Sequence, residues 1–264
     1  MQLVDSHCHA SEVWYEPVET LLDEMDRNEV RQAVLVQMLG QFDNAYLLDC
    51  LARHPRRFAA VVAVDPADTA AVRQLEALAA AGAAGVRLRP DARSPGEDPY
   101  ALWRAARSCG LAVSCVGPAA GFLSTAFATL LQELPDLPIV LEHLGGWARP
   151  DCDRSEATRE GIAALARFPN LSLKVPGLGQ LGARGPRLPA CGRALPLESG
   201  AIVLELLERF GGGRLMWGSD FPPVAAREGY RNALRWMEEL LGGLSAQQRA
   251  GIFGGAARQV FRLP

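Results

Sequence analysis

Short runs of apolar and β-branched residues recur along the chain, and between them apolar residues repeat with the spacing of an amphipathic helix. Most runs begin about 26 to 32 residues after the previous one, which is the length of one strand, one helix and their connections. The clearest helical spacing covers residues 18–25, 69–81 and 157–168. The runs predict eight strands, at residues 3–7, 32–38, 58–64, 84–89, 111–116, 138–143, 170–175 and 214–219.

Unbroken alternation of strands and helices is typical of α/β proteins in which crossover helices join parallel strands. Eight such units within 264 residues predict a (β/α)8 TIM barrel. An open, doubly wound sheet is the competing fold, but no glycine-rich fingerprint follows the first strand. We therefore expect a single domain over residues 1–264, with residues 245–264 forming a C-terminal helix that caps the barrel. Residues 176–200 form a long connection, and loops of this length usually have a function.

Composition narrows the class of protein further. The chain is 49% hydrophobic and 22% charged, which excludes a disordered chain. Its net charge of −3 lacks the basic excess typical of nucleic-acid-binding proteins, and the sequence contains no apolar run long enough for a membrane span. The first residues lack the basic and apolar regions of a secretion signal, so we interpret them as the start of the fold. The six cysteines are scattered without a CxxC pair, which favours a cytoplasmic protein.

Three of the four histidines fall at the carboxyl ends of predicted strands. His7 and His9 are two residues apart at the end of the first strand, so their side chains point to the same side. His143 ends the sixth strand, and Asp220 follows the eighth. In a closed barrel the first and eighth strands are neighbours, and the carboxyl ends of the strands form the mouth that holds the active site. We expect these four side chains to meet there. The alternatives are hydrogen-bonded histidines lining the barrel and an aspartate that caps a turn.

Several short segments together match one known family: Asp5-Ser-His7-Cys-His9, Leu22-Asp-Glu-Met-Asp26, Gly85-Val-Arg87, His143-Leu-Gly145, Lys174 and Gly218-Ser-Asp220-Phe-Pro222. With them the chain resembles, over nearly its whole length, the amidohydrolase superfamily. More specifically, it resembles the amidohydrolase-related group, which includes sugar lactonases, 2-pyrone-4,6-dicarboxylate lactonase and, more distantly, a decarboxylase type. The resemblance implies that His7, His9 and Asp220 form a metal-binding set. It also implies that Asp220 is the general base and that His143 polarises the reacting carbonyl group.

The chain departs from the two-metal members of this family. Those members carry a carboxylated lysine on the fourth strand and a histidine on the fifth, where this sequence has Arg87 and Arg89, then Ser114 and Cys115. The resemblance therefore implies one divalent ion or none. Zinc suits two imidazoles and a carboxylate, whereas the pyrone-dicarboxylate branch is expected to work without metal. Three further positions differ from the family pattern: Glu142, Pro176 and Ala256.

Cationic side chains near the mouth are the candidates for holding an anionic substrate. Arg87 and Arg89, on the predicted fourth strand, and Arg149, after the sixth, could grip a carboxylate through their guanidinium groups. The alternative for the first two is an internal layer of ion pairs. Lys174, the only lysine of the chain, either stabilises the oxyanion of the reaction or pairs with Glu142.

These features predict a hydrolase that opens a small cyclic ester, either a sugar-acid or a dicarboxylate lactone. Asp220 would take a proton from water, His143 and Lys174 would stabilise the oxyanion, and residues 176–200 would cover the mouth. Two other functions stay open: a metal-dependent decarboxylase of an unsaturated or aromatic acid, and a catalytically silent barrel that binds a small molecule. The expected partner is an anionic small molecule, without nucleic acid or membrane, and a homodimer stays open.

Overall fold

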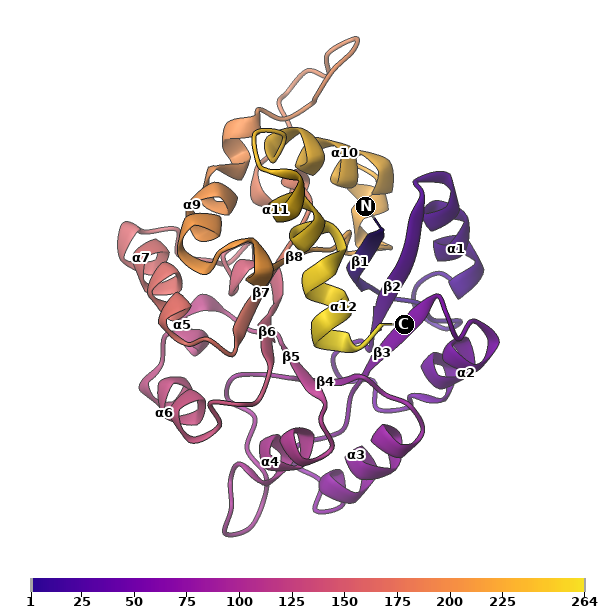
Figure 1. The fold of residues 1–264 in the computed structure, drawn as a ribbon, viewed down its shortest axis with the longest axis vertical. Coiled ribbons are helices and arrows are strands. Elements are labelled where there is room, and N and C mark those ends of the chain that lie inside the picture. Colours follow the sequence, from indigo (N-terminus) through magenta and orange to yellow (C-terminus); the bar gives the residue numbers. More distant parts are fainter. Residues whose placement is uncertain (1, 264) are drawn as a thin grey trace.

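The computed structural model describes residues 2–263 and contains eight parallel strands surrounded by helices (Figure 1). Each strand pairs with the next in sequence order, as in a TIM barrel. This order confirms the predicted (β/α)8 barrel and excludes the doubly wound sheet, in which the order reverses. The strands are β1 (Leu3–Cys8), β2 (Val30–Val36), β3 (Phe58–Val62), β4 (Gly85–Leu88), β5 (Ala112–Cys115), β6 (Ile139–Leu141), β7 (Leu171–Val175) and β8 (Leu215–Trp217).

All eight predicted strands are present, but several end earlier than the hydrophobic pattern suggests. β6 and β8 end at Leu141 and Trp217, before His143 and Asp220. Both of these later residues adopt a left-handed backbone, with φ of 51° and 59°, which does not occur in strands. His143 and Asp220 therefore lie on tight turns just beyond the ends of β6 and β8.

The barrel closes through a side chain at the junction of β1 and β8. The carboxylate of Asp5 accepts hydrogen bonds from the backbone N–H and the hydroxyl of Ser219, at 2.8 and 2.6 Å, and from the Tyr230 hydroxyl at 3.0 Å. The Asp220 N–H donates to the carbonyl oxygen of His7 at 2.8 Å. Because these bonds join the first strand to the loop after the last, they place His7 and Asp220 side by side.

Most helices lie around the outside of the sheet and bury one apolar side. α1 buries Val18, Leu21 and Met25, as the predicted helical spacing requires. No helix within residues 2–263 has both the length and the apolar character needed to cross a membrane. The helices are α1 (Val18–Arg27), α2 (Ala45–Arg53), α3 (Ala71–Ala80), α4 (Ala101–Ser108), α5 (Ala119–Phe122), α6 (Thr125–Glu133), α7 (Glu156–Ala164), α8 (Leu178–Leu181), α9 (Ala201–Phe210), α10 (Tyr230–Leu240), α11 (Ala246–Ala250) and α12 (Ala256–Phe261).

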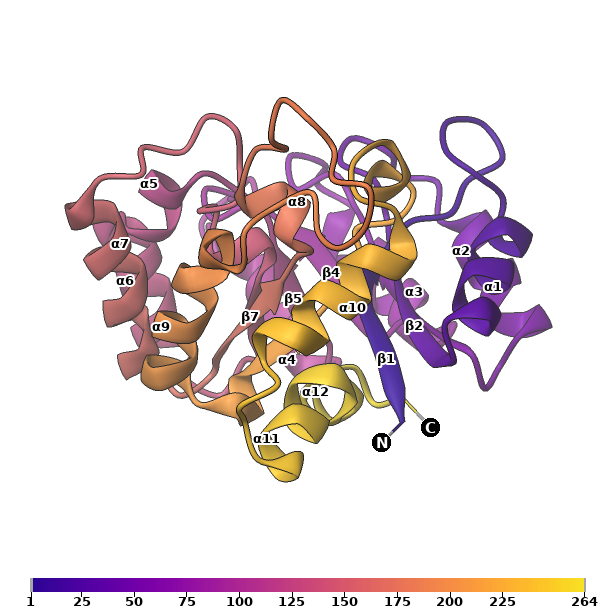
Figure 2. The same cartoon turned by 90° about the horizontal axis from the view of Figure 1, so that it is seen from above.

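Apolar side chains fill the inside of the barrel, and α12 closes one end of it. Val4, Val61, Val140 and Met216, from four different strands, pack in one cluster with Phe261 of α12. Figure 2 shows α11 and α12 beside the N-terminus, at the end of the barrel opposite the long loops. The carboxyl ends of the strands are therefore the side on which a site can open. Of the residues expected to form the C-terminal cap, residue 264 lies outside the described part.

The long connection of residues 176–200 contains α8 and a 3-10 turn at Leu197–Gly200. Its tip extends outward, beyond the ring of helices (Figure 1). Contrary to expectation, the tip does not cover the mouth. α8 does lie there, because its Gln180 contacts His143.

Candidate active site

The structure brings the four candidate side chains together at the carboxyl end of the barrel. One carboxylate oxygen of Asp220, Oδ1, lies 3.7 Å from His7 Nε2 and 3.6 Å from His9 Nε2. The rings of His7 and His143 are 5.0 Å apart between their centres. His7, His143, Lys174 and Asp220 line one narrow pocket. The site is thus built from β1, β6, β7 and β8, as closure of the barrel requires.

A series of buried hydrogen bonds connects His7 to Arg87. The Lys174 ammonium lies 3.0 Å from His7 Nδ1 and donates to the Ser114 hydroxyl at 2.8 Å. Ser114 in turn donates to Glu142 at 2.7 Å, and Glu142 accepts two hydrogen bonds from Arg87, at 2.6 and 3.1 Å. All five side chains are buried. Buried charged groups need hydrogen-bond partners of this kind. The hydrogen bonds therefore fix the positions of these five side chains.

The charged side chains of this hydrogen-bonded series shift one another's pKa values. Burial alone would raise the pKa of Glu142, but Arg87 and Lys174 outweigh it and lower that pKa to about 2. Burial lowers the pKa of Lys174 to about 8, against the opposing effect of Glu142. Burial, together with Lys174, keeps the pKa of His7 well below its usual value. At neutral pH we therefore expect an ionised Glu142, a largely protonated Lys174 and a neutral His7.

The neighbours of each histidine determine which ring nitrogen carries the proton. Protonated Lys174 can only donate, so His7 Nδ1 accepts and His7 Nε2 carries the hydrogen. That Nε2 is buried and has no hydrogen-bond partner among the described residues. His9 is the reverse case at Nδ1, because this nitrogen lies 2.6 Å from the Val36 carbonyl oxygen and must donate to it.

His143 has a less fixed proton position. Its Nδ1 lies 3.1 Å from the side-chain nitrogen of Gln180, while the Gln180 oxygen has no partner in the described part of the chain. The two orientations of an amide group differ by a rotation, and they impose opposite tautomers on the ring. Burial lowers the pKa of His143, against the pull of Asp220 and Glu142, so the ring is neutral near pH 7.

Asp220 stays ionised despite its burial. Burial by itself raises the pKa of Asp220, but contact with His9 and the nearby His143 and Arg227 outweigh it, so this pKa lies below its usual value. The second carboxylate oxygen, Oδ2, lies 3.3 Å from the guanidinium of Arg227. Asp220 can therefore act as a base toward a group held near His7.

The donor set fits one metal ion. The ligand atoms of His7, His143 and Asp220 lie within 4.8 Å of one another, and His9 Nε2 also faces Asp220. A metal-binding histidine normally donates its other ring N–H to an acceptor. His9 meets that condition, whereas His7 has the Lys174 amine at this position. The cluster includes His143, whereas the resemblance implied His7, His9 and Asp220, so the role of His9 as a ligand stays a prediction.

The three arginines predicted to hold a substrate carboxylate all pair with carboxylates of the chain itself. Arg87 takes the internal ion-pair arrangement that the sequence left open, and Arg89 is exposed. None of the three guanidinium groups is left unpaired, so their role in substrate binding stays a prediction. The pairs are Arg87–Glu142 at 2.6 Å, Arg89–Asp91 at 3.2 Å and Arg149–Asp151 at 2.8 Å.

Sequence reasoning missed three contacts of the site. Ser114 was noted only because it replaces a metal ligand, but it links Lys174 to Glu142. Gln180, in the four-residue helix α8, contacts His143, and Arg227, in a turn after β8, contacts Asp220. Both segments are too short for a periodic pattern to mark them. Their only signal is position, shortly after β7 and β8, where barrel enzymes build their sites.

Known proteins resemble this chain in sequence. The family model described as Amidohydrolase matches residues 4–263. L-fucono-1,5-lactonase of Burkholderia ambifaria is 32% identical over 144 residues, which cover 52% of this chain and 46% of that protein. The 4-sulfomuconolactone hydrolase of Hydrogenophaga intermedia is 27% identical over 184 residues, covering 68% of this chain and 56% of that protein. The matched regions thus span about half the length of these two relatives.

Solved structures share the whole fold. One is a protein of Pseudomonas putida whose suggested activity is that of a 2-pyrone-4,6-dicarboxylic acid hydrolase. It is 25% identical, with a TM-score of 0.76 over 99% of this chain and 98% of that one. Another is an amidohydrolase of Burkholderia multivorans with bound zinc, 20% identical, with a TM-score of 0.80 over 100% of both chains. The second likeness establishes the fold alone.

Proposed function

Because the chain belongs to the amidohydrolase family, we propose that it hydrolyses the ester bond of a small lactone at the site between His7, His143 and Asp220. One observation carries the proposal: His7 Nε2 is buried without a partner among residues 2–263 and lies 3.7 Å from the Asp220 carboxylate. A hydrogen-bond donor and a base therefore meet at a narrow pocket. Hydrolysis of a carbonyl compound needs these two groups, one for the carbonyl oxygen and one for the water.

In the proposed reaction Asp220 accepts a proton from water as the water oxygen attacks the lactone carbonyl carbon. The π electrons of the C=O bond move to its oxygen, which then accepts a hydrogen bond from His7 Nε2–H. The positive charge of Lys174, 3.0 Å from the far side of the His7 ring, stabilises this oxyanion through the ring. When the ring C–O bond breaks, the ring oxygen takes the proton from Asp220. The product is a hydroxy acid, and Asp220 is again a carboxylate.

We propose that His7, His143 and Asp220, with His9 beside them, hold one divalent ion, for which zinc best suits imidazole and carboxylate ligands. When bound, such an ion would replace the His7 Nε2–H donor of the metal-free reaction described above and would itself polarise the lactone carbonyl. Ligation through His7 Nε2 requires the hydrogen on Nδ1 and hence a neutral Lys174. The lowered pKa of Lys174, about 8, makes that form accessible.

Two observations favour a lactonase over the alternatives. On the fifth strand, the Ser114 hydroxyl is committed to Glu142 and Lys174, so this strand supplies no further metal ligand for a decarboxylase. A barrel without catalytic activity would not need an ionised Asp220 beside a His7 N–H that has no hydrogen-bond partner among the described residues. The two named sequence relatives are both lactone hydrolases by name.

We further propose a cytoplasmic location, since all six cysteines are free. We also propose a small anionic molecule as the partner.

A panel of sugar-acid and carboxylated lactones, read by acid release with a pH indicator, tests the proposal. Wild-type protein should open at least one of them, and Asp220→Asn should not. Asp136→Asn is the matched control, because Asp136 is an exposed aspartate that pairs with Arg107 before the start of β6 and does not line the pocket. Release of carbon dioxide without acid would instead identify a decarboxylase, and equal rates in wild-type and Asp220→Asn would refute the assigned site.

A further inference from the structure

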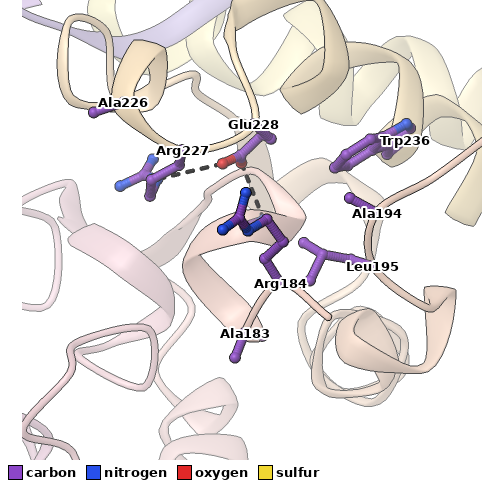
Figure 3. Close-up of a pocket in the computed structure, with 10 residues that line it drawn as sticks. Ala183, Arg184, Ala194, Leu195, Ala226, Arg227, Glu228 and Trp236 are labelled. Atoms are coloured by element: carbon purple, nitrogen blue, oxygen red, sulfur yellow. Dashed lines mark hydrogen bonds and ion pairs between the residues drawn. The ribbon is translucent and has the colours of Figure 1, made fainter. Parts of the chain in front are cut away.

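A second, larger cavity lies beside the candidate active site. It has a volume of about 450 Å³, a size suited to a small ligand. Its walls come from the connection after β7 on one side and the loop after β8 on the other, with Trp236 of α10 behind (Figure 3). Neither the proposed chemistry nor the predicted arginines account for it.

Arg227 forms the boundary between this cavity and the site. Its Nη1 lies 3.3 Å from Asp220, and its Nε lies 3.3 Å from Glu228. A quarter of the side chain is exposed, and it lines the cavity. The remaining nitrogen, Nη2, has no hydrogen-bond partner among residues 2–263. A guanidinium has five N–H donors, so Arg227 can bind a ligand while it keeps both carboxylate contacts.

Glu228 holds Arg227 in this place. Its side chain is buried, and it accepts a hydrogen bond from the Gly179 N–H at 3.0 Å. The backbone of α8 approaches it so closely that a Cβ atom at Gly177 or Gly179 would lie 2.2 or 2.0 Å from a Glu228 oxygen. A larger residue at either position would force the Glu228 carboxylate to move, so the two glycines let the segment before and within α8 pack closely against it.

Arg184 supplies a second positive charge to the same cavity. It is exposed, lines the cavity, and forms no hydrogen bond or ion pair within the described residues. Figure 3 shows its side chain pointing toward the Arg227–Glu228 pair. The cavity therefore combines two guanidinium groups with one carboxylate, and Arg184 is the cation without a partner. Paired guanidinium groups are the usual protein ligands of carboxylates.

We propose that this cavity binds the carboxylate of an acidic lactone, held by Arg184 and Arg227, while the reacting carbonyl lies between His7 and Asp220. The inference rests on the proposed function and names its substrate class. Arg227 contacts Asp220 and lines the cavity, so a carboxylate bound to this guanidinium lies next to the proposed base. Glu228 is a positioning residue, because it acts on the ligand through Arg227.

The test compares γ-butyrolactone γ-carboxylate with its neutral carboxamide. Wild-type protein should prefer the carboxylate. Arg184→Met should lose on the order of 10-fold or more in kcat/KM on the carboxylate and little on the carboxamide. Arg187→Met is the matched control, an exposed arginine of the same connection that does not line the cavity, and should resemble wild type. Glu228→Gln should raise KM for the carboxylate while kcat changes little.

Each result separates the two proposals. Equal losses on both compounds, no loss in Arg184→Met, or no preference in wild type would overturn the anion site and leave the lactonase standing. Failure of wild type to open either compound would count against the lactonase. Calorimetric titration with glutarate, a dicarboxylate that cannot be hydrolysed, then measures the anion site alone. Wild type and Arg187→Met must bind glutarate more tightly than Arg184→Met does, or the anion site is refuted.

Discussion

Removal of Arg87 distinguishes a structural ion pair from a substrate-binding arginine. The Arg87 side chain is 7% exposed and its partner Glu142 is fully buried, with contacts of 2.6 and 3.1 Å between them. In Arg87→Met the Glu142 carboxylate would lose these two donors and keep the Ser114 hydroxyl. Breaking a buried pair by removing one partner costs about 3–5 kcal/mol. At about 2 °C per kcal/mol for a chain of this size, Tm should fall by roughly 6–10 °C.

Thermal and urea unfolding of four proteins would measure this effect: wild type, Arg87→Met, Glu142→Gln and the double variant. The double variant should recover part of the loss, because neither charge is then left alone in the interior. Arg89→Met is the matched control, since Arg89 pairs with Asp91 at the surface and its loss should cost about 0.5 kcal/mol or less.

One outcome would refute the reasoning. If Arg87→Met kept the Tm of wild type and lost kcat/KM only on a carboxylated lactone, Arg87 would be a substrate-binding residue. The ion pair with Glu142 would then contribute little, and the arginine role inferred from the sequence would stand. Additive losses of Tm in the double variant would also show that the two charges do not stabilise each other.

Three further outcomes follow from the site. Asp220→Asn should lower kcat by about 10²- to 10⁴-fold with an unchanged circular dichroism spectrum, because it removes the base and not the fold; a normal rate would exclude Asp220 as the base. The pKa of Glu142 falls from 4.5 to about 2 on folding, so its stabilising contribution is full above the unfolded value and is lost as pH falls toward 2. Urea unfolding of Glu142→Gln should accordingly show a shallower loss of stability over that range, by at most about 1.4 kcal/mol per pH unit, and an unchanged slope would contradict the assignment. Elemental analysis after dialysis should find one equivalent of zinc per chain or none, and His143→Ala should reduce any zinc bound; two tightly held equivalents would contradict the single cluster.

Local patterns in the sequence were enough to predict the barrel and the convergence of its candidate side chains. Apolar runs mark strands because strand interiors must be buried, and eight strands in order leave few ways to arrange them. Once the first and eighth strands are neighbours, His7 and Asp220 must be close. This inference needs no knowledge of individual side-chain contacts.

The charge partners could not be predicted in the same way. Arg87 and Glu142 are 55 residues apart, and nothing local distinguishes a guanidinium that faces Glu142 from one that faces solvent. The positive φ of His143 and Asp220, which ends their strands early, also depends on tertiary contacts. Arg227 and Arg184 are two of many loop arginines, so only the cavity they line sets them apart.

The burial of Lys174 has a practical consequence for measuring motion. It is the only lysine of the chain, and 2% of its surface is exposed. All other side-chain cations except histidine are guanidinium groups, which acylating reagents for amines do not modify. Modification of a side-chain amine therefore requires the barrel to open. The rate at which mass spectrometry detects an acyl group on Lys174 would time that opening, with no background from other side-chain amines.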